Sequence, residues 1–304
     1  MSAIDGSGTA GVSVQVESAH SVTTDGTGYF QTEIDRTGNL GVVFTGGSIV
    51  ERRTMVNGPT LGRPRLSLIP STFDLRAFDE MFRTANGRLQ RWTSRPALVV
   101  VATVMSYRNP DDQYMTTGEQ MSDEEVTALI QHLTEGLTLL TGGTFTSFAD
   151  VSVERPASGV RVLVVRPGTI VVGRYNGIQT FASTIGYGRW AEDPSGSVTG
   201  GSMFLDSGFD RLDNRRRLLR IHELGHALGY LHVETRVSIM NPSIGPEPTE
   251  FDRTAAIIAF QRQPGNVSPD TDPQSIAAGN PFGPRETMWV APVACLDART
   301  TPRF

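Results

Sequence analysis

Residues 222–232 read His-Glu-Leu-Gly-His-Ala-Leu-Gly-Tyr-Leu-His. The spacing of this stretch is that of a helix that ends abruptly. On a helix, positions i and i+4 lie one turn apart on the same face. His222 and His226 can therefore point their imidazole rings at one ion. Gly229 can take the left-handed conformation that ends a helix and turns the chain back. His232 then arrives from the returning loop, so the sequence predicts three imidazoles at one point.

Three histidine ligands are typical of a catalytic zinc site, since the fourth coordination position stays open for water. Water bound to such an ion has its pKa lowered to about 7. Glu223, next to the first ligand, is expected to hydrogen-bond this water and to act as general base. The residues thus predict zinc-dependent hydrolysis. An ordinary helix with two histidines on one face is the alternative, but three of the chain's five histidines fall at the required spacing.

The elements around the motif predict an α+β fold. Helical periodicity covers about Asn214 to Leu228, and a last helix is predicted for Phe251 to Arg262. Ser122 and Glu125 form a capping box that opens a helix running to Leu140. Short apolar runs predict strands at Ala97 to Met105, Phe148 to Glu154, Val160 to Val165, Ile170 to Tyr175, Thr180 to Ile185 and Ser202 to Leu205.

Residues 1–70 favour a separate small antiparallel β-sandwich. Turn signals separate three short runs that predict strands, at Val12 to Val16, Gly28 to Ile34 and Val42 to Phe44. We therefore expect a β module at 1–70, a zinc hydrolase domain at 71–263 and a C-terminal tail at 264–304, which is rich in Pro, Gly, Asn and Asp and is expected to wrap the surface.

The pattern His-Glu-x-x-His-x-x-Gly-x-x-His resembles the signature of the metzincin clan of zinc metallopeptidases. Ser238-Ile-Met240-Asn-Pro242 is similar to the methionine turn of that clan, and the spacing of Met240 and Pro242 is most like the matrix metalloproteinase branch. The resemblance implies a catalytic domain with a twisted mixed sheet, and a floor beneath the metal formed by Met240. The N-terminal module resembles prealbumin-like or carboxypeptidase-regulatory-like modules through Asp25-Gly26 and Gly28-Tyr29-Phe30.

The resemblance also implies how a substrate binds. In this clan an extended peptide pairs with the edge strand above the zinc helix, as exposed sheet edges do generally. Thr180 to Ile185, just before Gly186-Tyr-Gly188, is the candidate edge. The pocket for the side chain after the cut is expected between the zinc helix and the loop Ser238 to Glu247. We therefore expect an endopeptidase that acts on a protein or peptide.

Several residues depart from the clan's pattern. Val233 follows the third histidine where several branches have a polar residue, and Asn241 replaces the tyrosine of two branches. Cys295 is the only cysteine and lies far downstream, so we interpret it as an inert tail residue rather than a thiol ligand for zinc. An auxiliary calcium site could be built from four acidic residues, although their spacing is loose: Asp193, Asp206, Asp210 and Asp213.

Composition excludes several classes of protein. With 38% apolar and 19% charged residues the chain is typical of globular proteins. Its longest apolar run is too short to span a bilayer, and a net charge of −5 gives no basic surface for nucleic acid. The first twenty residues lack the pattern of a signal peptide. Because peptidases are usually kept outside the cytosol, we nevertheless expect a secreted protein whose signal has been removed.

Two alternatives stay open. In the first, the protein is a non-catalytic adhesion or scaffold protein in which zinc only stiffens the fold; Glu223 speaks against it, since metal binding alone requires no carboxylate there. In the second, it is a zinc hydrolase of small amide or peptidoglycan-like substrates, which a pocket closed to extended peptides would favour.

Overall fold

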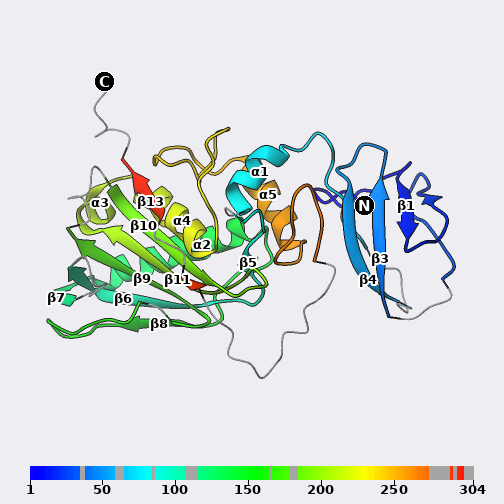
Figure 1. Cartoon of the computed structure of the whole chain (residues 1–304). Helices are drawn as coiled ribbons and strands as arrows, with labels where there is room; N and C mark the ends of the chain where they lie inside the picture. The colour runs from blue at the N-terminus through cyan, green and yellow to red at the C-terminus, as the bar shows by residue number, and fades with distance from the viewer. Residues whose placement is uncertain are drawn as a thin grey trace.

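The chain forms two β-sheets that lie toward opposite ends of the molecule (Figure 1). The computed structural model describes residues 1–34, 38–58, 65–83, 86–106, 115–164, 166–177, 184–273, 288–289 and 293–297. Within these ranges a four-stranded antiparallel sheet is built from the N-terminal residues and a nine-stranded mixed sheet from the rest. The architecture is therefore α+β, as the sequence predicts.

The N-terminal sheet has the order β2-β1-β3-β4. Its strands are β1 (Ser13–Val16), β2 (Val22–Thr23), β3 (Gly38–Thr45) and β4 (Arg52–Gly58). Alternate residues of β1 and β3, such as Val14 and Val42, point into a small apolar core of their own. The described residues of this region form one sheet, whereas the sequence predicted a two-sheet sandwich.

The predicted strand at Gly28 to Ile34 is wrong, since these residues form no strand. The physical reason is local turn chemistry. The Asp25 carboxylate accepts hydrogen bonds from the backbone amides of Thr27 and Tyr29, which curls the chain. Gly28 has a φ of 76°, and a Cβ there would lie 2.6 Å from the Thr9 nitrogen. A turn competes with the strand pattern here, and the turn prevails.

The large sheet has the order β12-β10-β11-β9-β6-β7, with β13 paired to β10, β5 to β11 and β8 to β6. Its strands are β5 (Arg91–Trp92), β6 (Ala97–Ser106), β7 (Met115–Gln120), β8 (Val151–Glu154), β9 (Thr169–Asn176), β10 (Thr184–Glu192), β11 (Ser197–Asp206), β12 (Met288–Trp289) and β13 (Val293–Leu296). Strands β6, β9 and β11 run parallel, and β10 runs antiparallel to β11.

Both faces of the central strands are buried, which explains their nearly continuous apolar sequence. Leu98 and Val100 of β6 belong to the main core together with the apolar residues of the helices. Val99 and Val101 point to the opposite face and pack against Val162 and the neighbouring Val164. Residues 160–164 were predicted as a strand but form only an isolated bridge at position 161; their valines cover the sheet instead. Val165, the end of that predicted strand, lies outside the described residues.

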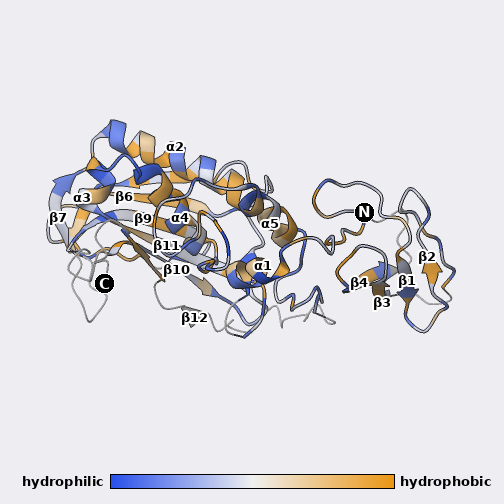
Figure 2. Cartoon of the chain, turned by 90° about the horizontal axis from the view of Figure 1, so that it is seen from above, coloured by the Kyte–Doolittle hydropathy of each residue, from blue (hydrophilic) through white to orange (hydrophobic). Residues whose placement is uncertain are grey.

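Five helices accompany the sheets in the described part of the chain: α1 (Leu75–Phe82), α2 (Asp123–Leu140), α3 (Ser207–Leu212), α4 (Arg216–Ala227) and α5 (Glu250–Phe260). The predicted capping box of α2 is confirmed, because Ser122 and Glu125 bond each other's backbone amides. Hydropathy colouring shows α2 with apolar residues along one side and polar residues along the other (Figure 2). Within the described ranges, no helix has the length and apolar character needed to cross a membrane.

The C-terminal residues take part in the large sheet. Strands β12 and β13 both pair antiparallel with β10, so the described parts of 288–297 extend the sheet instead of only wrapping the surface. In Figure 1 the red arrow of β13 lies beside β10. Of the edge segment predicted at Thr180 to Ile185, positions 180–183 lie outside the described residues, and β10 begins at Thr184.

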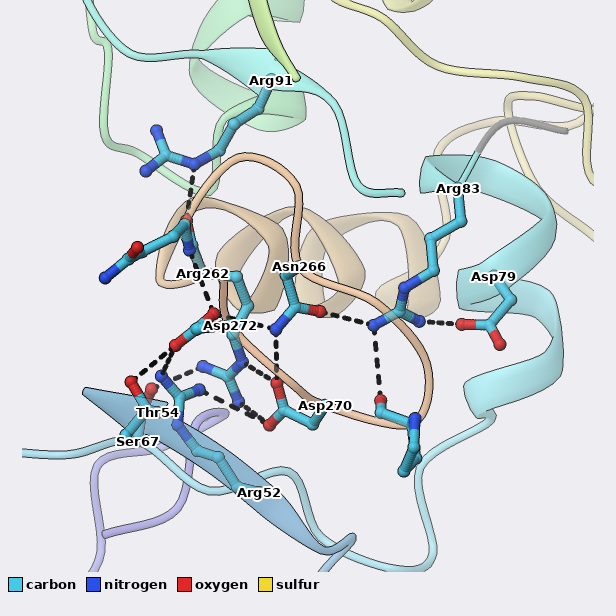
Figure 3. Close-up of polar contacts among 12 residues, drawn as sticks. Arg52, Thr54, Ser67, Asp79, Arg83, Arg91, Arg262, Asn266, Asp270 and Asp272 are labelled. Atoms are coloured by element: carbon cyan, nitrogen blue, oxygen red, sulfur yellow. Dashed lines mark hydrogen bonds and ion pairs between the residues drawn. The ribbon is translucent and has the colours of Figure 1, made fainter. Parts of the chain in front are cut away.

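A buried polar cluster joins the two parts of the chain (Figure 3). Arg52 of β4 donates to Asp272 at 2.8 Å and lies 3.5 Å from Asp270. Arg262, just after α5, forms two hydrogen bonds to Asp270, at 2.6 and 2.8 Å. Asn266 donates to both carboxylates. Because these side chains are almost fully buried, the N-terminal sheet is fixed to the larger part by charges withdrawn from water.

Candidate metal centre

Helix α4 holds His222 and His226 in the buried interior of the larger part of the chain. Every residue from Leu218 to Ala227 is buried, because the helix packs between α2 and strands β10 and β11. Two glycines of β10 allow this approach: a Cβ at Gly186 would overlap the Glu223 carboxylate, and a Cβ at Gly188 would overlap the helix at His226. The Gly-Tyr-Gly sequence is therefore needed for the strand to lie directly on the helix.

The predicted hinge is confirmed at Gly229. Its φ of 102° lies in the region that favours glycine, and the amide of Tyr230 bonds back to the carbonyl of Gly225 at 2.9 Å. The chain then reverses, the Leu231 amide bonds to the Met81 carbonyl, and His232 arrives beside the helix. One glycine thus brings the third histidine to the first two.

The three imidazoles converge through their Nε2 atoms. The Nε2 of His226 lies 3.0 Å from that of His222 and 3.2 Å from that of His232. A tetrahedral ion about 2.0–2.1 Å from each nitrogen would separate the nitrogens by about 3.3 Å. The three residues therefore could hold a metal ion.

Hydrogen bonds at the other ring nitrogens support this conclusion. The Nδ1 of His222 lies 2.7 Å from the Ile239 carbonyl, and the Nδ1 of His226 lies 2.7 Å from the Tyr230 carbonyl. A carbonyl only accepts, so both Nδ1 atoms must carry the proton, which leaves lone pairs on the Nε2 atoms of the neutral rings. Lone pairs that face each other at 3.0 Å repel, and a cation between them removes the conflict.

Burial keeps these rings neutral. Desolvation, followed by the charge of His232, lowers the pKa of His222 to about 3. Desolvation also lowers the pKa of His232 to about 4 and that of His226 well below its usual value. Neutral imidazole is the form that binds a metal, so the histidines are ready to bind one at neutral pH.

Glu223 is the unusual group of the site. Its side chain is fully buried, and neither carboxylate oxygen has a hydrogen-bond partner. Burial raises its pKa well above the ordinary value of a glutamate. Burying a carboxyl group without hydrogen-bond partners lowers the free energy of unfolding. Glu223 directly follows the first histidine of the motif. Such a group can accept a proton from a water molecule bound at the three histidines.

The turn at Ser238 to Asn241 is fastened to the helix. The Ile239 carbonyl receives the His222 ring, and Met240 is buried against Gly225, where a Cβ would overlap its sulfur. Asp252 of α5 accepts hydrogen bonds from the Ser238 hydroxyl and the Ile239 amide. Asn241 donates to the Val233 carbonyl at 2.6 Å. Sequence reasoning missed Asp252, although its place in the Thr249–Asp252 capping box is a signal that could have found it.

The acidic residues considered for calcium are not brought together in the described part of the chain. Asp206 caps α3 and Asp193 accepts from the amides of its own turn. Asp210 pairs with Arg174 and Arg220, and the fourth, Asp213, bonds the Arg215 amide. Each carboxylate has a structural role, so these residues form no cation site.

Cys295 is the residue whose position the sequence interpretation missed. It is fully buried in the main core, in β13. Its sulfur, a ring nitrogen of His222 and a carboxylate oxygen of Glu223 all lie within 4.8 Å of one another. The sequence favoured an inert tail residue because β-pairing between segments about 110 positions apart leaves no local signal.

No model of a known protein family matches the sequence, and no curated protein matches it either.

Proposed function

We propose that the chain is a zinc endopeptidase of metzincin type, with His222, His226 and His232 as metal ligands and Glu223 as general base. The observation that carries the proposal is the convergence of three Nε2 atoms beside a buried carboxylate that has no other partner. The assignment to the metzincin clan rests on the resemblance of residues 222–242 to the clan's signature. It is supported by the glycine hinge, the third histidine and the methionine turn.

The chemistry needs a metal of the zinc type, which when bound polarises a carbonyl and makes water acidic. The histidines hold it: their Nδ1 protons are fixed by the carbonyls of Ile239 and Tyr230, so the ring orientation is set in advance. Glu223 takes the proton of the attacking water and then delivers it to the departing amine. Burial raises the pKa of this carboxyl well above its ordinary value, which makes it a stronger base than an exposed glutamate.

An extended peptide is the proposed substrate. It would pair with β10, which packs against α4. Because β13 pairs with β10 at Thr184 to Gly188, a peptide could bind along these residues only if β13 were displaced. The side chain after the cut would lie between α4 and the loop Ser238 to Glu247.

Metal analysis combined with a peptide-library digest tests the proposal. Wild-type protein is expected to bind one zinc ion per chain and to cut peptides internally. Glu223→Gln should keep the zinc and lose about 10²–10⁴-fold in turnover, because the general base is gone and the shape is kept. His232→Ala should lose the zinc itself.

Three outcomes would overturn the proposal. Full turnover in Glu223→Gln would mean that another base acts, and unchanged zinc content in His232→Ala would refute the third ligand. A chelator that lowers thermal stability while no peptide is ever cut would identify the metal as structural and support the scaffold alternative.

A further inference from the structure

The third histidine is held differently from the other two. His222 and His226 belong to a helix, and the Nδ1 of each ring is fixed by a backbone carbonyl. His232 lies in residues 231–238, which form neither helix nor strand, and within the described ranges its Nδ1 has no hydrogen-bond partner. The position of the His232 ring therefore depends on the backbone on either side of it.

Two backbone hydrogen bonds flank His232. The Leu231 amide donates to the carbonyl of Met81, near the end of α1, at 2.9 Å. The Val233 amide donates to the carbonyl of Met240, in the methionine turn, at 2.9 Å. The segment that carries the third histidine is thus bonded to α1 before the histidine and to the methionine turn after it.

Glu80 of α1 binds the next two residues of the segment. Its Oε2 atom accepts hydrogen bonds from the Glu234 amide at 3.0 Å, from the Thr235 amide at 3.1 Å and from the Thr235 hydroxyl at 2.8 Å. Hydrogen bonds to an ionised acceptor are stronger than those between neutral groups. One carboxylate oxygen therefore fixes the course of the chain two and three residues after His232.

The Glu80 side chain is charged at neutral pH. Partial desolvation disfavours the charged form, but the hydrogen bonds from Thr235 and Glu234 outweigh it and hold the pKa of Glu80 below its usual range. Arg76 lies 3.7 Å from the other carboxylate oxygen, but its side chain is 80% exposed, so this ion pair contributes little. The three hydrogen bonds to residues 234 and 235 are the main interactions of this carboxylate.

Helix α1 is a firm support for these contacts. Phe78, Met81 and Phe82 are fully buried in the main core. Arg83, which ends the helix, donates to the buried Asn266 at 2.7 Å and forms an ion pair with Asp79 (Figure 3). Packing on one side and a buried polar cluster at the end therefore hold the helix that carries Glu80.

We propose that Glu80 is the positioning residue of the third metal ligand, because it fixes the segment after His232 and so places this ring beside His222 and His226. Glu80 touches neither the three rings nor a substrate and acts through the backbone. The inference rests on the proposed function, since it concerns how the same site binds its metal. Hydrogen-bond partners behind a ligand typically change metal affinity about 10–100-fold.

Competition with a chromophoric chelator tests the proposal. Glu80→Ala should lower the zinc affinity of the full chain about 10–100-fold. Glu80→Gln should recover most of this loss, because its amide oxygen has the same reach and still accepts hydrogen bonds. Arg76→Gln, on the same helix, removes only the exposed ion pair with Glu80. This variant is the control and should keep the wild-type affinity.

A double-mutant cycle separates positioning of the ligand from a general loss of stability. Cobalt titration can measure the weak binding that His222 and His226 retain in His232→Ala. In that background Glu80→Ala should change the affinity less than about twofold, because the ligand that Glu80 positions is gone. A residue that only stabilised the fold would lower the affinity equally in both backgrounds.

Hydrogen exchange of the metal-free protein gives a readout that needs no zinc. Exchange at the amides of Glu234 and Thr235 should speed up in Glu80→Ala and stay unchanged in Arg76→Gln. Wild-type zinc affinity in Glu80→Ala, or equal losses of affinity with and without His232, would overturn the inference and leave the proposed function standing. A wild-type chain that binds no zinc would overturn both.

Discussion

Single residues of the metal centre show how burial prepares the site and also makes it sensitive to acid. His222 and His226 are fully buried, and each donates its Nδ1 proton to a backbone carbonyl. The fold thereby selects one tautomer and one protonation state before any metal arrives. The neutral rings do not destabilise the fold at neutral pH. At lower pH the unfolded chain takes up protons that the folded histidines do not bind, which lowers the free energy of unfolding.

The metal-free protein should therefore lose stability as the pH falls below about 6.5. Burial holds the pKa of His222 at about 3 in the folded state, whereas an unfolded histidine titrates near about 6.5. Between these values the unfolded chain binds a proton that folded His222 does not bind. The free energy of unfolding should then fall by up to about 1.4 kcal/mol per pH unit from this residue, and should be unaffected by it above about pH 6.5.

Denaturant titrations in the presence of a chelator measure this slope. His222→Asn should show a shallower dependence on pH than wild type. His20→Asn, at an exposed position of the N-terminal region, should keep the wild-type slope. A free energy of unfolding that is flat between about pH 6.5 and 4 would contradict the linkage argument.

At the scale of elements, the end of α4 is the critical feature, because a helix that continued past Ala227 would carry His232 away from the ion. Gly229→Ala should strain the backbone by about 1–2 kcal/mol, and the new Cβ would lie 3.0 Å from Val198. Since the strain lies between His226 and His232, the proposed second and third ligands, zinc affinity should fall about 10–100-fold. Competition with a chromophoric chelator measures the affinity.

Gly143→Ala is the matched control for this prediction. Gly143 also has a positive φ, of 79°, but no atom lies within 4 Å of a Cβ placed there. The variant should lose comparable stability and keep its zinc affinity. Equal zinc affinity in the two variants would show that the hinge does not position His232.

The elements differ in how well the sequence predicts them, for physical reasons. The α2 helix and the end of α4 are determined by nearby residues, Ser122 with Glu125 and Gly229, so local patterns predict them correctly. The strand predicted at Thr180 to Ile185 ended too early, since β10 continues to Glu192, and β4 was missed. The pairing of β13 with β10 depends on contacts between distant segments, which periodicity within one segment cannot report.

The same distinction holds for the site. The histidines and Glu223 follow from helix geometry, and the structure brings the three rings together. Cys295, Asp252 and the glycines of β10 reach the site only through tertiary packing. Local rules therefore predict the histidine cluster, while the position of β10 beside it comes from the structure.

At the scale of the whole molecule, the buried cluster around Asp270 and Asp272 couples the N-terminal sheet to the larger part of the chain (Figure 3). Two cations, Arg52 and Arg262, and the side-chain amide of Asn266 contact the two carboxylates. Backbone hydrogen bonds also join Arg53 to Asp270 and Asp272. Burying such paired charges adds little to the free energy of unfolding. Removing one partner lowers it strongly, because the remaining charge stays desolvated and unpaired. The two parts should consequently unfold as one cooperative unit.

Arg52→Met should break this coupling. It removes the cation that lies 2.8 Å from Asp272 and keeps the volume of the side chain. The free energy of unfolding should fall by about 3–5 kcal/mol, because the carboxylate stays buried without its counter-ion. Arg53→Met is the control, since the Arg53 side chain is 56% exposed and lies 2.7 Å from the carboxylate of exposed Glu51; this change should cost about 0–1 kcal/mol. Denaturant unfolding followed by tryptophan fluorescence measures this effect. The signal reports on the larger part of the chain, because Trp92, Trp190 and Trp289 all lie there. It therefore shows whether a change in the N-terminal sheet lowers the stability of the larger part. If Arg52→Met and Arg53→Met unfold at the same denaturant concentration, the cluster does not couple the two parts.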